Sequence, residues 1–431
     1  MNPGRDRVVA ARSTGSFQIL WSLWERTLLR GTSGGLALVA AWFVTPADLG
    51  HYSVAIAFLT LGMAVTDISL RQLGVIVPKE DLPGIAAIAR RIALATVPLN
   101  LLATGTLLAS GAEWDELAKL LPLYLVPFMS ARGSASVAQL QRNDDFRTVA
   151  RIQGIAATIS LLGCLPLLLA LGDILALSLQ FLATEAIAAH LFRRKCRVSP
   201  QPKYNMLKRL STVAVPNVAA WVQSQSERIA IVLVTDASTV GAFGFAAAIG
   251  RLGNDVVTAG IVNYFRPILA RHTHEPNQWR RVSMALIYRV AAGSSIASAL
   301  IIAGNFLLLG PALDPAWGPA VALIPAAAAS VGLSSMGWVA TTLLVVKGEA
   351  RRVWRLQAVG IALVVPVAFS SVWGVPGLAV ALVGRELVMV PVRVLSLRKL
   401  LTQRELLTAW VAYLPLVALA CLAAYAGTTT S

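Results

Sequence analysis

Long apolar runs dominate the pattern of this 431-residue chain. A helix needs about 20 mostly apolar residues to cross a bilayer. The runs do not alternate strictly between apolar and polar residues, which excludes a membrane β-barrel, because barrel strands alternate over about 10 residues. The pattern therefore predicts an all-α polytopic membrane protein with thirteen spans, near 17–44, 50–77, 84–110, 116–140, 147–171, 174–192, 207–235, 240–270, 282–309, 316–346, 353–373, 376–397 and 405–427.

Composition and charge support this interpretation and orient the chain. Hydrophobic residues make up 56% of the sequence and charged residues only 13%, whereas soluble proteins carry about 25% charged residues. Lys and Arg collect on the cytoplasmic loops of membrane proteins. The segment 193–209 alone holds seven of them, which explains the net charge of +16 better than a nucleic-acid partner does. The predicted external loops hold one basic residue, Lys119, and seven acids, Asp48, Glu113, Asp115, Glu116, Asp173, Asp236 and Asp314.

The alternation of basic and acidic connecting segments along the chain predicts a bacterial inner-membrane protein with a cytoplasmic N-terminus. We expect no cleaved signal peptide, because the apolar stretch from Phe17 continues for about a full span. The connecting segments are too short to form a catalytic domain, and no GxxxxGK[ST] nucleotide-binding loop occurs. The three cysteines are scattered without metal-ligand spacing. We therefore expect a transport protein rather than an enzyme, with no cofactor and no metal.

An internal repeat divides the chain into two halves. At an offset of 191 residues, 44–59 resembles the segment that starts at Val234. Residues i, i+4 and i+7 share one face of a helix. At this offset the polar faces of two pairs of spans coincide as faces. In the first pair, one face holds Ser22, Arg26, Arg30 and Ser33, and the other holds Asn217, Trp221, Ser224 and Arg228. In the second pair, one face holds Thr60, Asp67, Arg71 and Gly74, and the other holds Arg251, Asp255, Thr258 and Arg266.

Six spans separate the two copies, so the halves have the same orientation, and transporters built from such repeats bind substrate near the midplane. The basic linker at 193–206 marks the boundary. The predicted domains are an N-lobe over 1–200 with spans one to six, a C-lobe over 201–400 with spans seven to twelve, and an additional C-terminal span over 401–431.

Four segments carry a resemblance to a known family: TPADLGHY (45–52), ASTVGAFGFAAAIGRL (237–252), AQLQRNDDFRTVARI (138–152) and NYFRPILAR (263–271). Over roughly 15–400 the chain resembles the polysaccharide and O-antigen exporters, which are lipid-linked oligosaccharide flippases of the multidrug/oligosaccharidyl-lipid/polysaccharide exporter superfamily. The resemblance implies two six-helix lobes around a central cavity, alternating access, and a polyprenyl-pyrophosphate-linked oligosaccharide as cargo. Polysaccharide polymerases and glycosyltransferases are the partners it implies. The thirteenth span departs from the usual twelve or fourteen.

Charged residues within the spans are the candidate functional residues. A charge at the bilayer centre costs roughly 2.5–3.5 kcal/mol on insertion scales, so such residues usually face a cavity. Guanidinium groups bind phosphate through charge-assisted, bidentate hydrogen bonds. The candidates for substrate binding are Arg26, Arg30, Arg71, Arg228 and Arg251, and the candidates for ion coupling are Asp67 and Asp255.

Competing interpretations exist for several of these residues. Arg26 also fits a side chain that extends to the cytoplasmic interface. Asp67 and Arg71 also fit a self-neutralising i, i+4 pair. Trp221 fits either stacking on a sugar ring or ordinary packing. Glu185, Arg385 and Glu386 are interpreted as contacts between helices outside the cavity.

Two functions other than glycolipid transport fit the same composition. A cation-driven drug extruder of the same superfamily needs an acidic cavity, and the polar faces hold more Arg than acid. A membrane polymerase or glycosyltransferase needs a large extramembrane loop, which the sequence lacks.

Overall fold

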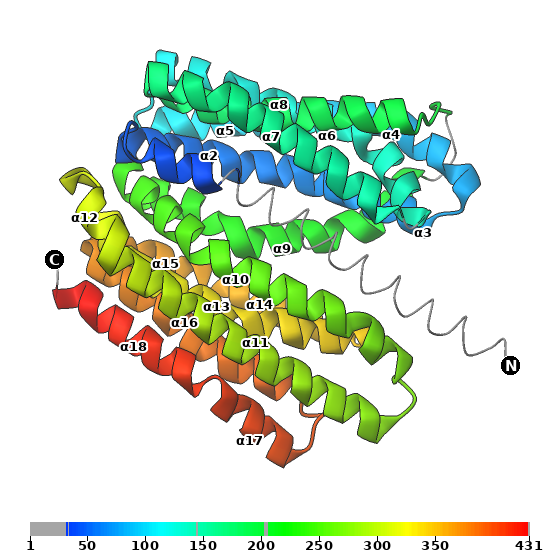
Figure 1. The fold of residues 1–431 in the computed structure, drawn as a ribbon, viewed down its shortest axis with the longest axis vertical. Coiled ribbons are helices and arrows are strands. Elements are labelled where there is room, and N and C mark those ends of the chain that lie inside the picture. The colour runs from blue at the N-terminus through cyan, green and yellow to red at the C-terminus, as the bar shows by residue number, and fades with distance from the viewer. Residues whose placement is uncertain (1–31, 33, 144, 202–205, 430–431) are drawn as a thin grey trace, which may run out of the picture. The chain divides into compact units, whose positions relative to one another are not determined.

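The structure, a computed structural model, describes residues 32, 34–143, 145–201 and 206–429. Every regular element among these residues is a helix, which confirms the all-α prediction (Figure 1). Residues 34–40 are helical. The elements that follow are α2 (Pro46–Met63), the π-helix η1 (Ala64–Ser69), α3 (Leu70–Ile76), η2 (Lys79–Asp81), α4 (Leu82–Leu94), α5 (Val97–Ala109), α6 (Trp114–Arg142), α7 (Phe146–Leu171), α8 (Ile174–Lys195), α9 (Met206–Val234), α10 (Ala237–Arg271), α11 (Pro276–Gly304), the π-helix η3 (Asn305–Leu309), α12 (Gly310–Ala312), η4 (Pro315–Trp317), α13 (Gly318–Val346), α14 (Ala350–Ala362), α15 (Val364–Ser370), η5 (Ser371–Trp373), α16 (Gly374–Ser396), α17 (Gln403–Ala412) and α18 (Leu414–Thr429).

The chain divides into two compact units. Unit 1 comprises Met1–Phe43 and Ala55–Trp221, and unit 2 comprises Val44–Val54 and Val222–Ser431. In unit 1, α6 packs along α8 and against α3 and α4, while α7 packs on α8. In unit 2, α13 packs against α10, α11, α16 and α18. The predicted lobe boundary near residue 200 stays a prediction.

The central position of α13 in unit 2 follows from its sequence. It is rich in Ala and Gly, and its polar residues are Ser and Thr, so neighbouring helices can approach it closely. Buried residues make up 72% of an apolar 18-residue stretch of Pro315–Val346, compared with 22% for such a stretch of Pro276–Ala312. The more exposed helices present large apolar side chains such as Leu300 and Leu307 instead, as expected for a surface that faces lipid.

Eight helical stretches of the described residues are long and apolar enough to cross a membrane, and the bent pair α17 and α18 raises the number to nine. The protein is thus a multi-pass membrane protein, although the count of thirteen is not reproduced by this criterion. The helices α6 and α9, which were predicted as spans, are each 29 residues long but fall outside the eight. Their polar residues explain this, because α6 carries Asp115, Glu116 and Lys119 at its start and Arg132 with several serines farther on, and α9 carries Glu227 and Arg228.

Two predicted spans, 353–373 and 376–397, lie in one helical stretch of 46 residues, Arg351–Ser396. The stretch is a hairpin rather than a single rod. The Arg352 guanidinium donates to the carbonyl oxygen of Ser396 at 3.2 Å, so the two ends meet, and α15 packs on α16. The chain reverses at Gly374, whose φ of +67° suits glycine. Each arm corresponds to one of the two predicted spans.

A close helix crossing joins the first turns of α2 and α10 within unit 2. A Cβ atom on Gly50 would overlap the carbonyl oxygen of Ala237, and one on Gly241 would overlap the carbonyl oxygen of Pro46. A Cβ on Gly244 would lie 2.5 Å from the Ser53 hydroxyl. The residues of the crossing correspond at the 191-residue offset, 46 with 237, 50 with 241 and 53 with 244. Small residues permit this approach, as in other membrane helix pairs.

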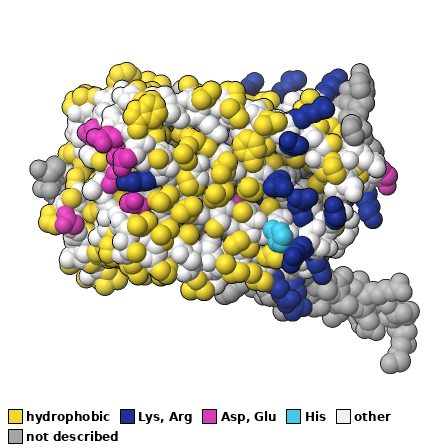
Figure 2. All heavy atoms as spheres, turned by 90° about the horizontal axis from the view of Figure 1, so that it is seen from above, with side chains coloured by type: hydrophobic (Ala, Val, Ile, Leu, Met, Phe, Trp, Pro, Cys, Tyr) yellow, Lys and Arg dark blue, Asp and Glu magenta, His cyan; other side chains and the backbone are white. Residues whose placement is uncertain are grey.

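Figure 2 shows one face of the molecule, seen from above Figure 1, where apolar side chains form a broad surface. Lys and Arg gather toward one side of this surface, and Asp and Glu gather toward the other. Several acids predicted to be external serve as helix caps in the structure. Glu113 and Glu116 form a capping box on α6, and Asp173 accepts from the Leu175 amide at 2.9 Å. Carboxylates at helix N-termini satisfy free amides and complement the helix dipole.

Asp236 caps α10, and its removal should have a measurable effect. Its carboxylate accepts from the Thr239 amide at 2.8 Å and from the Ser238 hydroxyl at 2.6 Å. Burial opposes ionisation, but these hydrogen bonds outweigh it and lower the pKa of Asp236 below its ordinary value.

Replacing Asp236 with alanine should therefore cost about 1 kcal/mol of stability. The cost should be full above the ordinary pKa of aspartate, about 3.9, and vanish as pH falls through the lower folded-state pKa. Thermal unfolding of wild type and Asp236→Ala across this range measures it, and an equal difference at every pH would contradict the capping role.

Candidate functional site

The candidate site in unit 1 centres on a distorted segment of the second predicted span. A single π-helical stretch, η1, interrupts the α-helix between α2 and α3. The Ser69 hydroxyl donates to the Ala64 carbonyl at 2.5 Å, and the Thr66 hydroxyl donates to the Gly62 carbonyl at 2.9 Å. Such π-bulges are rare and occur frequently at functional sites. In η1, whose sequence is AVTDIS, the hydroxyls of Thr66 and Ser69 thus bond to backbone carbonyl oxygens that a regular helix would pair with backbone amides. These bonds explain why the π-helix forms at this position.

The π-helix places Asp67 beside Arg71. The Arg71 Nε atom lies 2.5 Å from an Asp67 carboxylate oxygen, and both side chains are largely buried. This is the i, i+4 pair expected from the sequence. In an apolar bundle, each charge reduces the cost of burying the other. The contact fits the structural interpretation of Asp67 and Arg71 as a self-neutralising pair.

The first half of α9 holds this distorted segment from one side. The Asn217 amide donates to Ser69 Oγ at 3.0 Å and to Gln72 Oε1 at 3.1 Å. The Trp221 indole donates to the Ala57 carbonyl at 2.8 Å and to the Thr60 hydroxyl at 3.1 Å. Trp221 therefore packs against α2 through its polar edge. These contacts favour the packing interpretation of Trp221 over sugar stacking.

Glu185 joins the Asp67–Arg71 pair. Sequence reasoning interpreted this residue on α8 as a contact between helices, and it lies within electrostatic reach of Asp67 and Arg71, with the Ser130 hydroxyl of α6 beside its carboxylate. Helix α6 makes this possible, because it packs against both η1 and α8. No pattern in the sequence links these positions. The only available signal was the presence of an acid inside an apolar helix.

The other candidates occupy different places. Arg26 and Arg30 lie outside the described residues. In unit 2, Arg228 on α9 is partly buried and lies within electrostatic reach of Tyr52. Arg251 and Asp255 are partly buried on α10.

Asn254, between Arg251 and Asp255 in sequence, points into the core of unit 2. Its amide lies 3.1 Å from the Gly250 carbonyl, 3.2 Å from Ser298 Oγ and 3.3 Å from the Ala328 carbonyl. The Ser298 hydroxyl also donates to the Ala328 carbonyl, at 2.9 Å. Asn254 thus joins α10 to α11 and α13, a packing role that its sequence position did not reveal.

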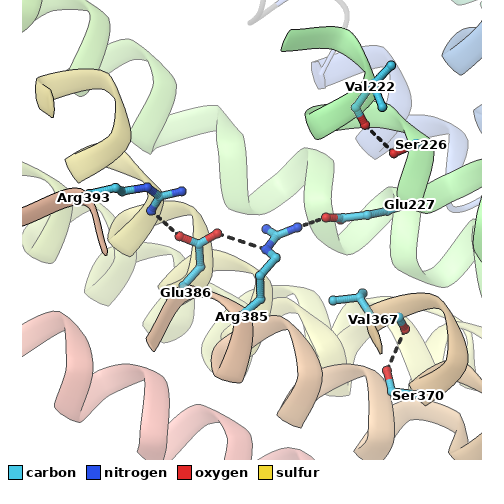
Figure 3. Close-up of polar contacts among 8 residues, drawn as sticks. All are labelled: Val222, Ser226, Glu227, Val367, Ser370, Arg385, Glu386 and Arg393. Atoms are coloured by element: carbon cyan, nitrogen blue, oxygen red, sulfur yellow. Dashed lines mark hydrogen bonds and ion pairs between the residues drawn. The ribbon is translucent and has the colours of Figure 1, made fainter. Parts of the chain in front are cut away.

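Unit 2 contains a buried ionic network that the sequence did not reveal. Glu386 on α16 accepts from Arg393 at 2.5 Å and from Arg385 at 3.1 Å (Figure 3). Arg385 also forms an ion pair with Glu227 on α9. The four side chains alternate in sign and are neutral together when all are ionised. Arg385 therefore makes the predicted contact between helices, through Glu227 on α9, which sequence reasoning did not identify as its partner. Glu386 pairs with Arg385 and Arg393 of its own helix, α16.

Within the described residues, no three side chains among His, Cys, Asp and Glu are arranged to hold a metal ion. The charged groups that these residues bring together inside the helices are ion pairs and networks of guanidinium and carboxylate. Such an arrangement is suited to binding anions and to holding or exchanging protons. Nucleophilic or metal-assisted catalysis requires other groups.

The decisive observation comes from comparison with known protein families. A model of the family described as "Polysaccharide biosynthesis protein" matches residues 39–292, more than half of the chain. The protein belongs to this family. A search of curated protein sequences finds no match to the chain.

Solved structures show that this family member has the fold of the multidrug/oligosaccharidyl-lipid/polysaccharide exporter superfamily. The structure titled "Lipid II flippase MurJ, inward closed conformation" matches with a TM-score of 0.70 at 12% identity, over 95% of this chain and 98% of that chain. The Vibrio cholerae MATE transporter VcmN matches with a TM-score of 0.61 at 14% identity, over 94% and 97%. An inward-facing MATE multidrug transporter matches with a TM-score of 0.57 at 13% identity, over 89% and 94%. The expected fold is thus confirmed.

Proposed function

We propose that the protein is a flippase that moves a polyprenyl-pyrophosphate-linked oligosaccharide across the bacterial inner membrane for surface polysaccharide synthesis. The family assignment over residues 39–292 carries the proposal, because it connects the chain to polysaccharide biosynthesis. The fold supports a transport role, since it is shared with proteins whose names describe a flippase and multidrug transporters. Alternating access between inward-open and outward-open states moves the substrate in this proposal.

The charge of the candidate residues favours an anionic substrate. Arg71 is largely buried near the end of the second span, and Arg228 and Arg251 lie in α9 and α10. A pyrophosphate offers several oxygens to guanidinium groups, and such charge-assisted bonds are roughly twice as strong as neutral ones. Arg26, Arg30, Arg71, Arg228 and Arg251 are proposed to contact the pyrophosphate during transport, and Asp67 and Asp255 are proposed to take part in ion coupling.

A cation-coupled multidrug extruder is the second candidate, favoured by the fold similarity to MATE transporters. An extruder of cationic drugs would need acids that outnumber bases along its pathway. Resistance to cationic drugs on overexpression, with surface polysaccharide unchanged on deletion of the gene, would favour this candidate instead.

Replacing Arg30 with alanine tests the flippase proposal in cells. We expect loss of most surface polysaccharide in a strain that depends on this protein, because the first span would lose its central anion-binding group. Polysaccharide blots and membrane abundance of the protein are the measurements. Arg194→Ala, which removes an exposed arginine near the end of α8, is the control and should keep export. Normal polysaccharide with Arg30→Ala would contradict the assigned role.

A further inference from the structure

Helix α11 carries an exposed arginine, Arg289, at the edge of its apolar run. The residues that follow, 290–309, include no charged side chain, and this run has the length of about 20 residues that crosses a hydrocarbon core. The helix itself begins at Pro276, well before Arg289. Arg289 therefore lies where the hydrocarbon of the bilayer meets the lipid headgroups.

The face of α11 that holds Arg289 continues as an apolar stripe. Ile296 follows Arg289 by seven residues and Leu300 by eleven, which is about two and about three helical turns. The three side chains thus lie on one face of the helix. Ile296 is 63% exposed and Leu300 is 67% exposed, as expected for a surface covered by lipid chains. A guanidinium therefore stands at one end of a lipid-facing stripe.

The aromatic ring of Phe265, on α10, holds the Arg289 guanidinium. The Cζ atom of Arg289 lies 5.1 Å from the centroid of this buried ring. An aromatic face attracts a guanidinium, whose N–H donors lie in its own plane and stay able to bind an anion. Tyr288 adjoins Arg289 in sequence, and the ring of Tyr264 lies 5.3 Å from that of Phe265. Both tyrosines are 45% exposed, which is typical of side chains at the headgroup level.

No carboxylate among the described residues forms an ion pair with Arg289. Helix α11 contains three arginines and no acid over its whole length, Pro276–Gly304. The acid of α10, Asp255, precedes Phe265 by ten residues, about 15 Å along the helix. The contact with Phe265 does not neutralise the guanidinium, so its charge at the edge of the hydrocarbon favours a neighbouring anion.

We propose that Arg289 binds the phosphate of an anionic phospholipid at the surface of unit 2, and that an acyl chain of the same lipid covers Ile296 and Leu300. The guanidinium offers paired N–H donors to the phosphate oxygens, and the Tyr288 hydroxyl is able to donate to the headgroup. A soluble anion would match the guanidinium but would leave the apolar stripe uncovered, whereas a lipid matches both. This binding site is independent of the proposed flippase function.

Native mass spectrometry of the purified full-length protein, titrated with phosphatidylglycerol, tests the site. We expect the wild type to bind phosphatidylglycerol more tightly than phosphatidylethanolamine, whose headgroup carries no net charge. Arg289→Gln should bind phosphatidylglycerol about tenfold or more weakly, the loss expected when a charge-assisted hydrogen bond is removed. Arg289→Lys, which keeps the charge but not the planar fork, should have an intermediate affinity. Equal affinity of the wild type and a folded Arg289→Gln would overturn the site.

Arg281→Gln is the matched control, because it removes the same charge from another exposed position on α11, about two turns before Arg289 and about 80° around the helix. It should keep the affinity for phosphatidylglycerol. An equal loss in both variants would show a general attraction between basic residues and anionic lipid, and would contradict a site at Arg289.

Competition distinguishes the sources of the phosphate. Inorganic pyrophosphate should not displace phosphatidylglycerol, because it cannot cover Ile296 and Leu300, and displacement at equal concentration would assign the site to a soluble anion. A polyprenyl pyrophosphate that binds in an Arg289-dependent manner where phosphatidylglycerol does not would assign the site to the transport substrate. Either result would overturn the phospholipid site.

Discussion

Replacing Glu386 with alanine should lower the free energy of unfolding by about 3–5 kcal/mol. The side chain is 2% exposed and accepts from Arg393 and Arg385. Its removal leaves Arg393, which is 5% exposed, as a buried charge without its carboxylate, and leaves Arg385 with Glu227 alone. Desolvated charges without partners are among the most destabilising features in protein interiors. Thermal unfolding in detergent, supported by equilibrium unfolding in bicelles, measures the loss.

A double variant separates the broken network from simple loss of packing. Replacing both Glu386 and Arg393 with methionine removes one complete ion pair and leaves the Arg385–Glu227 pair in place. Buried pairs replaced by apolar residues are often neutral or stabilising, so the double variant should be more stable than Glu386→Ala. If it loses as much stability as the single variant, the unpaired charge of Arg393 is not the cause of the loss. Glu80→Ala, at an exposed position, should change stability little.

Replacing Gly50 with alanine should destabilise the protein by about 3 kcal/mol or more, at the upper end of overpacking effects. The added Cβ would overlap the backbone oxygen of Ala237, which cannot rotate away as a side chain can. The first turns of α2 and α10 would therefore have to separate. Gly241→Ala should have a similar effect, because its Cβ would overlap the carbonyl oxygen of Pro46.

The matched control for this substitution is Gly105 on α5, where an added Cβ meets nothing within 4 Å. Alanine is a better helix former than glycine by about 1 kcal/mol. Gly105→Ala should therefore stabilise the protein slightly or leave it unchanged, opposite in sign to Gly50→Ala. Unfolding temperatures of the three variants measure this, and a neutral Gly50→Ala would show that the close crossing does not contribute to stability.

The helices were largely predictable because their apolar runs are long. The predicted run 174–192 corresponds to α8 and the run 147–171 corresponds to α7, since the cap Asp173 and the left-handed Gly172 mark the turn between them. The number of spans was harder to predict. The reversal within Arg351–Ser396 was predicted, because the spans 353–373 and 376–397 correspond to the two arms that turn at Gly374. The apolar runs of α6 and α9 were also predicted as spans, but these helices carry too many polar residues to meet the hydropathy criterion.

The candidate site was predictable only where its contacts are local. The Asp67–Arg71 pair follows from i, i+4 spacing, and the structure contains it. Glu185 and Ser130 come from other helices, so their proximity to this pair depends on tertiary packing. The π-helix also escaped prediction, because it arises from side-chain bonds to the backbone, such as Ser69 with Ala64, rather than from an apolar period.

Translocation of a defined glycolipid by the purified protein tests the central claim most directly. Liposomes with and without the protein would contain a polyprenyl pyrophosphate that carries a short fluorescent oligosaccharide, and an impermeant glycosidase added outside would report which molecules are accessible. The flippase account predicts that nearly all of the label becomes accessible only in vesicles that contain the protein. It also predicts that Arg71→Gln, verified to be folded, slows this conversion strongly. Equal accessibility in vesicles with wild-type protein and in protein-free vesicles would contradict the account.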